Sequence, residues 1–109
     1  MYKVCGTTIT MVRGDTFIAN VHLKRGEEEY LPNENDIIRF AMRRSGEVRT
    51  RLVKIVPNDT LELHILPEDT QDFPPGLYKY DLEIEFADGS KDTFINRADL
   101  NLLSDVCRE

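Results

Sequence analysis

The side chains best suited to catalysis or metal binding in this 109-residue chain are those of two histidines and three serines. His22 and His64 fall on the polar sides of predicted strands, without the HxH or HxxxH spacing that favours a zinc site. Ser45, Ser90 and Ser104 lie outside the Gly-x-Ser-x-Gly pattern of a nucleophile elbow. A phosphate-binding loop and a dinucleotide fingerprint are also missing. We therefore expect no enzyme activity, no metal and no other cofactor.

Two cysteines, Cys5 and Cys107, lie near the two ends of the chain. Chain ends hold catalytic geometry poorly, and two thiols are too few to bind a metal alone. A scaffold that depends on disulfides normally carries more cysteines. The pattern favours two reduced thiols over a bridge.

Two tripeptides match recognition motifs. Arg13-Gly14-Asp15 matches an integrin-binding sequence, and Asn58-Asp59-Thr60 matches an N-glycosylation sequon. Such short motifs arise often by chance, and both fall where the chain has to turn between predicted strands. We interpret both as turns.

The net charge of −6 argues against a protein that binds nucleic acid, because such proteins usually carry a basic face. Acidic runs at 27–29, 34–36 and 69–72 could supply oxygen ligands to Ca²⁺. The stretch PNENDI, however, lacks the full alternating ligand series. These charges are better explained as keeping loops solvated and sheet edges unpaired.

No apolar run approaches the ~20 residues that a membrane-spanning helix needs. The start MYKVCGTTIT carries no long apolar stretch typical of a secretory signal. We expect no membrane association.

The elements that must position any site are strands. In DFPPGLYKYDLEIEF, residues 72–86, two prolines and a glycine precede a run whose apolar side chains recur at every second position. This period is typical of a strand with one buried face. Similar signals occur along the chain with turn residues roughly every ten positions, which predicts about seven to nine strands. PEDTQDF is predicted to form one helical turn, capped by Asp69 or Thr70.

These elements predict one domain over residues 1–109, an antiparallel immunoglobulin-like β-sandwich. Asp88-Gly89 is a strong signal for a two-residue hairpin turn. "SKDTFINRADL" would return from this turn, and "LNLLSDV" would close the chain. In the predicted core, one face of the strand after the prolines packs against apolar residues from other strands. The first set is Tyr80, Leu82, Ile84 and Phe86, and the second is Phe17, Val21, Phe40 and Leu63.

The proline stretch further predicts a structural corner made by Pro74, Pro75, Gly76 and Tyr78. Immunoglobulin-like sandwiches place a tyrosine near the start of strand F, and its hydroxyl bonds to backbone upstream. Tyr78 would have this role, and Tyr80 would occupy the place of the usual core cysteine. The chain has no tryptophan and no cysteine at a core position, so the hallmarks of antibody domains are missing.

Nearly the whole chain resembles a group of small virion-associated β-sandwich domains of phages. The group includes the N-terminal immunoglobulin-like domain of the baseplate upper protein in tailed phages of Gram-positive bacteria. The resemblance is carried by turn and corner residues: Gly14-Asp15-Thr16, Glu68-Asp69-Thr70, Pro75-Gly76 with Tyr78 and Asp81, and Asp88-Gly89. It implies a structural role in a virion and brings no catalytic residues.

Two functions remain open from the sequence. The first is a virion component of a tail, baseplate or head that binds other virion proteins or itself, present in the virion or in the bacterial cytoplasm during assembly. Its candidate interface is a set of arginines that could meet an acidic patch such as Glu83 and Glu85 of a neighbour: Arg39, Arg43, Arg49 and Arg51. The second is a small immunoglobulin-like module that inhibits or adheres to a host protein. Neither implies a small-molecule substrate.

Overall fold

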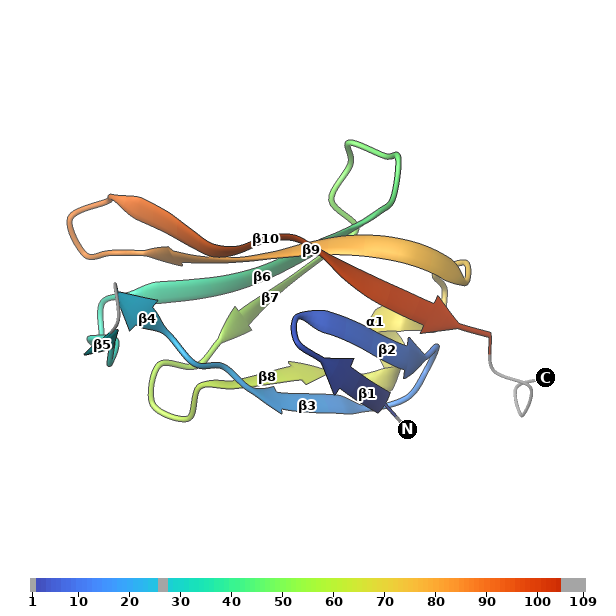
Figure 1. Ribbon diagram of the computed structural model, residues 1–109, viewed down its shortest axis with the longest axis horizontal. Helices are drawn as coiled ribbons and strands as arrows, with labels where there is room; N and C mark the ends of the chain where they lie inside the picture. Colours follow the sequence, from blue (N-terminus) through green and yellow to red (C-terminus); the bar gives the residue numbers. More distant parts are fainter. Residues whose placement is uncertain (1, 26–27, 105–109) are drawn as a thin grey trace.

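A computed structural model describes residues 2–25 and 28–104, with side chains for 6–23 and 28–104. The fold is all-β, as predicted (Figure 1). Its strands are β1 (Tyr2–Cys5), β2 (Thr8–Val12), β3 (Phe17–Asn20), β4 (Lys24–Arg25), β5 (Glu28–Glu29), β6 (Ile37–Arg44), β7 (Leu52–Val56), β8 (Glu62–Ile65), β9 (Gly76–Glu85) and β10 (Lys91–Leu103). One helical turn, α1 (Pro67–Thr70), precedes β9.

The main sheet has six strands in the order β1-β2-β10-β9-β6-β7. Strand β9 is central and pairs antiparallel with both β6 and β10. Strand β2, in contrast, runs parallel to β10, with Ile9 opposite Leu100 and Met11 opposite Leu102. The sheet is therefore mixed, and the prediction of an antiparallel fold was wrong at this point.

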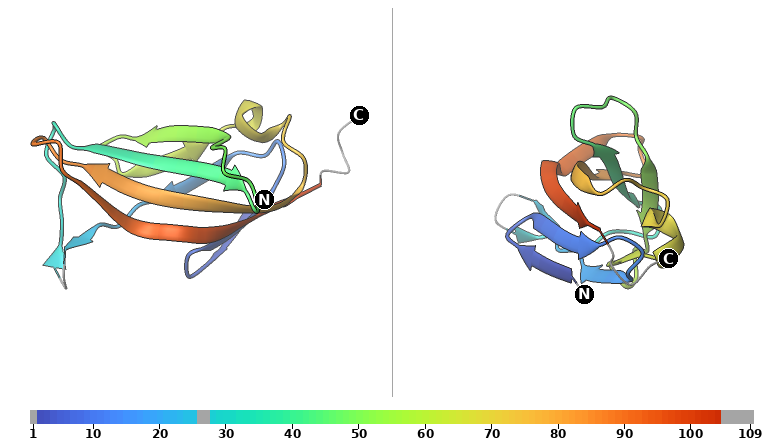
Figure 2. Two further views of the ribbon diagram at one scale, coloured as in Figure 1. Left: turned by 90° about the horizontal axis from the view of Figure 1, so that it is seen from above. Right: turned by 90° about the vertical axis from the view of Figure 1, so that its right-hand side faces the viewer.

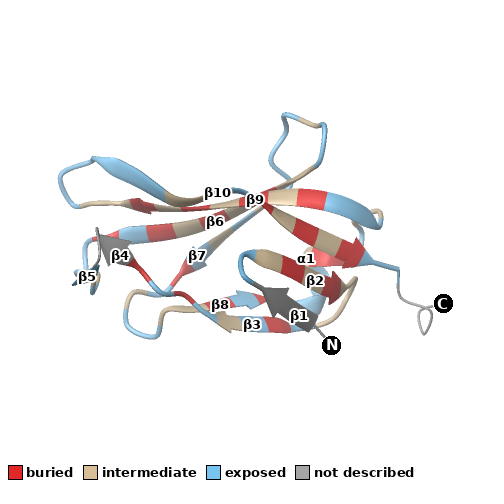
Figure 3. Cartoon of the chain, in the orientation of Figure 1, coloured by how far each residue is buried: buried red, intermediate tan, exposed pale blue. Residues whose placement is uncertain are grey.

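A smaller sheet of β3 and β8 covers the inner face of the main sheet, as the views in Figures 1 and 2 show. From β3 onwards Phe17, Val21 and Leu23 are buried while Ile18 and His22 are exposed, which agrees with the predicted core positions of Phe17 and Val21. Strand β3 nevertheless ends at Asn20, and Val21–Leu23 continue without strand pairing. Figure 3 shows the buried positions between the two sheets.

The run after the prolines forms β9 with the predicted faces. Tyr78, Tyr80, Leu82 and Ile84 are buried, whereas the residues between them are exposed or half-buried. The backbone alternates side chains across the sheet, so one face can be fully apolar and the other charged. One core prediction needs correction: Phe40 lies beside Leu82 in the same sheet rather than across from it.

Strand β10 differs most from the sequence prediction. The segments predicted as two strands form one 13-residue strand, Lys91–Leu103. Its pairing with β9 is irregular between Thr93 and Ile95 and again between Ile95 and Ala98. These irregularities are bulges, which let a long strand bend around the core without ending. The short strands β1, β4 and β5 were not predicted.

Two local predictions also need correction. The turn after β9 is a three-residue loop, because Phe86 N–H bonds to Ser90 O at 2.8 Å and Gly89 N–H bonds to Phe86 O at 2.9 Å. Gly89 has a φ of 91°, whereas the φ of Asp88 is not positive, so only one of the two residues has the positive φ that a two-residue hairpin turn favours. In α1 the N-cap is Leu66, whose N–H donates to the Asp69 carboxylate at 2.7 Å. Thr70 is buried at the end of the turn and does not cap it.

Candidate interaction surface

The side chains considered for catalysis are dispersed over the surface. His22 is exposed after β3, and His64 is exposed on β8, where its Nε2 lies 3.3 Å from a Glu62 oxygen. The Ser90 hydroxyl donates to Asp88 at 2.6 Å. Among the described side chains, those of residues 6–23 and 28–104, no three from His, Cys, Asp or Glu are grouped so that they could hold a metal ion. Cys107 and the side chain of Cys5 lie outside the described residues.

The Arg13-Gly14-Asp15 tripeptide forms a turn fastened to the domain. Gly14 has φ of 83°, and its N–H donates to the Thr70 hydroxyl at 2.9 Å. Arg13 donates to the Phe73 carbonyl at 3.3 Å, and Asp15 N–H bonds to Val12 O at 3.1 Å. The arginine is thus directed at the domain itself, which supports the interpretation as a turn.

The sequon and one acidic run meet at the β7–β8 turn. The Asn58 amide donates to the Asn33 carbonyl at 2.8 Å. The buried Asp36 accepts hydrogen bonds from the Tyr30 hydroxyl at 2.6 Å and from Asn33 N–H at 2.9 Å. Asp36 therefore stabilises the loop 30–36 through protein donors, a role that the sequence analysis did not assign.

The proline corner adopts the geometry expected from its residue types. Gly76 has φ of 148°, a value that disfavours any side chain, and Pro74 and Pro75 precede it. The Tyr78 hydroxyl donates to the Pro74 carbonyl at 2.7 Å, and its ring stacks on Phe73 with 5.9 Å between centroids. The Tyr80 hydroxyl donates to the carbonyl of Thr7. Burial raises the pKa of both tyrosines.

The arginines of the candidate interface divide into two pairs. Arg39 bonds to Glu83 at 3.2 Å and to Glu85 at 3.1 Å within the same chain. The hydrogen bond to Glu85 is the largest cause of the raised pKa of Arg39. The expectation that these carboxylates would meet an arginine of a neighbour therefore does not apply to Arg39.

Arg51 lies on the loop between β6 and β7 and bonds to Glu47 at 2.9 Å, which lowers the pKa of that carboxyl. Its guanidinium also lies 6.0 Å from the centre of the Phe73 ring. Among the described side chains, Arg43 and Arg49 have no ion-pair partner. Arg49 also contributes, less than Arg51, to the lowered pKa of Glu47.

The outer face of the main sheet, turned away from β3 and β8, carries exposed aliphatic side chains that the sequence analysis did not single out. Val53 and Ile55 on β7 are 53% and 59% exposed. They lie beside Ala41 and Arg39 of β6 in the strand register. The outward positions of the sheet carry five exposed aliphatic residues in all: Ile37, Val53, Ile55, Leu77 and Leu103. We call this set the outer aliphatic face.

The signal for this face was present in the sequence. DIIRFAMRR and VRTRLVKIV carry apolar residues on both alternating faces, whereas LYKYDLEIEF is charged on one of them. A doubly apolar strand indicates burial on both sides, or an exposed contact surface. β7 lies at the edge of the sheet, and the exposure of Val53 and Ile55 shows that no described residue covers its outer face, so burial on both sides does not apply.

No protein-family model matches the chain, and no curated protein matches it. The helix that the described residues contain, α1, is too short and too polar to cross a lipid bilayer.

Proposed function

We propose that this chain is a non-enzymatic component of a phage virion, in the tail, the baseplate or associated with the head, that acts through protein–protein contacts. Its fold would be an immunoglobulin-like sandwich in which β3 and β8 form one sheet and β6, β9 and β10 belong to the other. Two features support this assignment. One is Tyr78 at the start of β9, whose hydroxyl bonds to upstream backbone. The other is the set of turn and corner residues that carry the resemblance to virion-associated domains.

The outer aliphatic face is the observation that carries the contact function. Monomeric proteins rarely expose contiguous apolar patches of large size, and such patches mark interaction sites. Here Ile37, Val53 and Ile55 lie around the Arg39 side chain, whose charge is balanced by Glu83 and Glu85. Covering the aliphatic side chains would favour binding, whereas desolvating the Arg39 ion pairs would oppose it unless they stay intact, so this face suits a partner with its own apolar patch and no competing charge at Arg39.

Arg43 extends this face at the end of β6 that leads to the projecting β6–β7 loop (Figure 1). Arg49 on that loop carries a second unpaired charge. Arginine is enriched at protein interfaces because its guanidinium combines apolar area with several donors. These two residues would therefore position a partner whose rim is acidic.

Particle association tests the proposal. Particles of the phage or prophage encoding the chain are purified and assayed for the protein, with Val53→Glu and Ile55→Glu as the interface variants. Leu31→Glu serves as the matched control, because Leu31 is 72% exposed and lies on a loop, outside the strands of the main sheet. We expect wild type and control in the particles, and both interface variants in the soluble fraction.

A different result would select the alternative function. If the wild-type chain is absent from particles but forms a stoichiometric soluble complex with a host protein, it is a host-directed binding module. Equal incorporation of all variants would show that the outer aliphatic face is not the contact surface.

A further inference from the structure

One long edge of the main sheet is only partly used. Strand β9 pairs with β10 from Lys91 to Leu102, whereas on the other side β2 pairs only with Leu100–Leu103. Within the described part of the chain, no strand pairs with the other side of β10 from Lys91 to Asp99. Viewed from above, this edge runs between the β4–β5 pair and the β1–β2 hairpin (Figure 2). The backbone groups of this free edge are available to another strand.

The edge of the main sheet formed by β7 is protected against strand addition. Lys54 in β7 has its side chain on the inner face and pairs with Asp69 at 3.0 Å. A charged residue turned inward is one way in which natural edge strands resist pairing with another chain. Strand addition is therefore favoured at β10 over β7.

A strained residue marks the middle of the free edge. Arg97 has φ of 52°, a conformation that is unfavourable for a residue with a side chain, at a bulge in the pairing with β9. Its N–H donates to the Asp81 carboxylate at 2.6 Å instead of joining the ladder. Such strain concentrates at sites with a function, because the surrounding structure has to maintain it.

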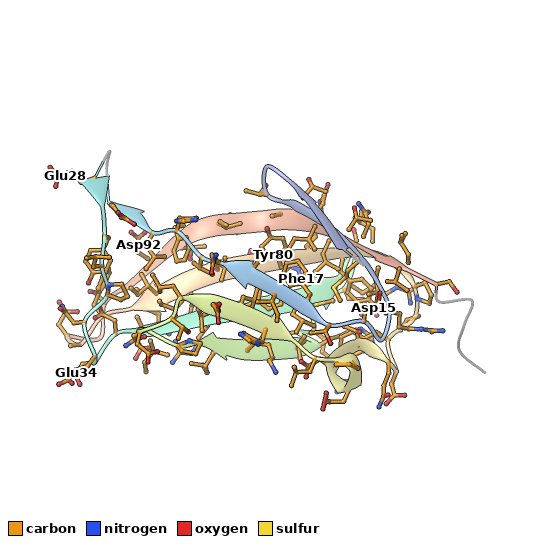
Figure 4. The ribbon with its side chains drawn as sticks, turned by 90° about the horizontal axis from the view of Figure 1, so that it is seen from below. Asp15, Phe17, Glu28, Glu34, Tyr80 and Asp92 are labelled. Carbon is orange, nitrogen blue, oxygen red and sulfur yellow. The ribbon has the colours of Figure 1, made fainter. Side chains whose placement is uncertain are left out.

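Two hollows adjoin this edge. The first, of about 230 Å³, is mainly apolar and is lined by core residues that include Phe17, Leu63, Tyr80 and Leu82. Phe17 of β3 and Tyr80 of β9, both labelled in Figure 4, line this hollow from different sheets, and His22 also lines it. The second hollow, of about 430 Å³, is polar and is lined by residues that include Lys79, Asn96, Arg97 and Asp99. Thr7 and Ile95 line both, so the two hollows share part of the β10 edge.

The residues that line the polar hollow carry two positive charges and one negative charge, and the Asp81 carboxylate lies next to them on the Arg97 N–H. Lys79 is paired with Asp99, whereas the Arg97 guanidinium has no partner among the described residues. A carboxylate entering here would meet an arginine whose charge is not already balanced. Charge complementarity thus specifies an acidic residue in the partner.

We propose that the free edge of β10 binds an extended segment of a partner protein in which apolar and acidic residues alternate. Adjacent side chains of a strand point to opposite sides, so an apolar side chain would enter the first hollow while the next residue meets Arg97. The backbone of the segment would pair with β10 by strand addition. This inference rests on the proposed function only in that the chain acts through protein contacts, and it names a second surface for them.

The test uses the whole chain and a synthetic, end-blocked peptide of sequence Thr-Val-Glu-Val-Glu-Val-Thr, with a Lys-for-Glu version as comparison. Amide chemical shifts are followed by NMR while each peptide is titrated to millimolar concentration. We expect the Glu peptide to shift residues 91–98 together with Thr7 and Thr8, and to bind about tenfold more tightly than the Lys peptide.

Two variants and one control make the result decisive. Arg97→Glu should reverse the preference between the peptides, and Ala19→Leu should weaken binding by filling the apolar hollow that Ala19 lines. Arg49→Glu makes the same charge change at a distant exposed loop and should leave binding unchanged. Circular dichroism verifies that each variant is folded. Absence of binding, shifts centred on another surface, or an unchanged preference in Arg97→Glu would overturn the proposal.

This experiment is independent of the particle assay. Peptide binding without particle incorporation would support strand addition while removing the virion role. Incorporation without peptide binding would retain the virion role and overturn strand addition.

Discussion

The Tyr78 hydroxyl donates a hydrogen bond of 2.7 Å to the carbonyl oxygen of Pro74, four residues upstream. The bond closes the corner between α1 and β9, and the Tyr78 ring is fully buried. Because β9 is the central strand of the main sheet, the direction in which it leaves this corner determines where β6 and β10 can pair.

Removing this hydroxyl tests the structural role of the corner. Tyr78→Phe keeps the ring and its stacking on Phe73 but leaves the Pro74 carbonyl without its donor. We expect a loss of about 1 kcal/mol in the free energy of unfolding, measured by denaturant titration, because the half-buried Pro74 carbonyl loses the hydrogen bond from Tyr78. Unchanged stability together with loss of particle association would instead make the corner a binding surface.

The two faces of β9 provide a matched pair of substitutions. Leu82 is 5% exposed on the inner face, whereas Leu77 is 39% exposed on the outer face of the same strand. Leu82→Ala should destabilise the fold by about 2–5 kcal/mol, towards the lower end because the side chain borders an existing hollow. Leu77→Ala should change stability by less than about 0.5 kcal/mol. A larger effect at Leu77 than at Leu82 would mean that the faces are reversed.

The buried tyrosines predict a stability loss at high pH. Burial raises the pKa of Tyr78 and Tyr80 above the ordinary value, near pH ~10, that they regain in the unfolded chain. Below that value both states are protonated and the stabilisation is complete. At higher pH the unfolded chain releases these protons first, so stability falls as the pH rises through the folded-state pKa values. Phenolate absorbance should therefore show a late-titrating component from Tyr78 and Tyr80 that appears together with unfolding. Early titration of both tyrosines would contradict the burial.

Gly89 is predicted to matter for its backbone conformation alone. Its φ is 91°, and a Cβ built at this position meets no atom within 4 Å. Gly89→Ala should therefore destabilise the β9–β10 hairpin through backbone strain of about 1–2 kcal/mol, visible as a lowered midpoint of thermal unfolding. Asp88→Ala should destabilise the protein less than Gly89→Ala, because Asp88 does not have a positive φ. The reverse order would show that the Asp88 hydrogen bonds to Ser90 control the turn.

Much of the local structure was predictable because it depends on neighbours in the chain. Alternating apolar residues identified the inner face of β9, and the residue types of Pro74, Gly76 and Tyr78 identified the corner. The same reasoning identified the turn at Gly14 and the position of the turn at Gly89, although that turn has three residues and not the predicted two.

Pairing between strands was decided only by the tertiary structure. A period of two specifies which side chains share a face, but it does not specify which strand lies alongside or in which direction. The parallel pairing of β2 with β10, the continuous β10 with its strained Arg97, and the ion pairs of Arg39 within its own chain all depend on that choice.

The exposure of the candidate surfaces was also decided only by the tertiary structure. By itself the sequence determined an all-β chain and the buried face of its clearly alternating strands, such as β9, because burial and turn chemistry are encoded locally. Which outward aliphatic residues stay exposed, and which edge of the sheet stays unpaired, follow from how the six strands are ordered around one core. That order is set by packing many distant residues at once, so it could not be read from any one segment.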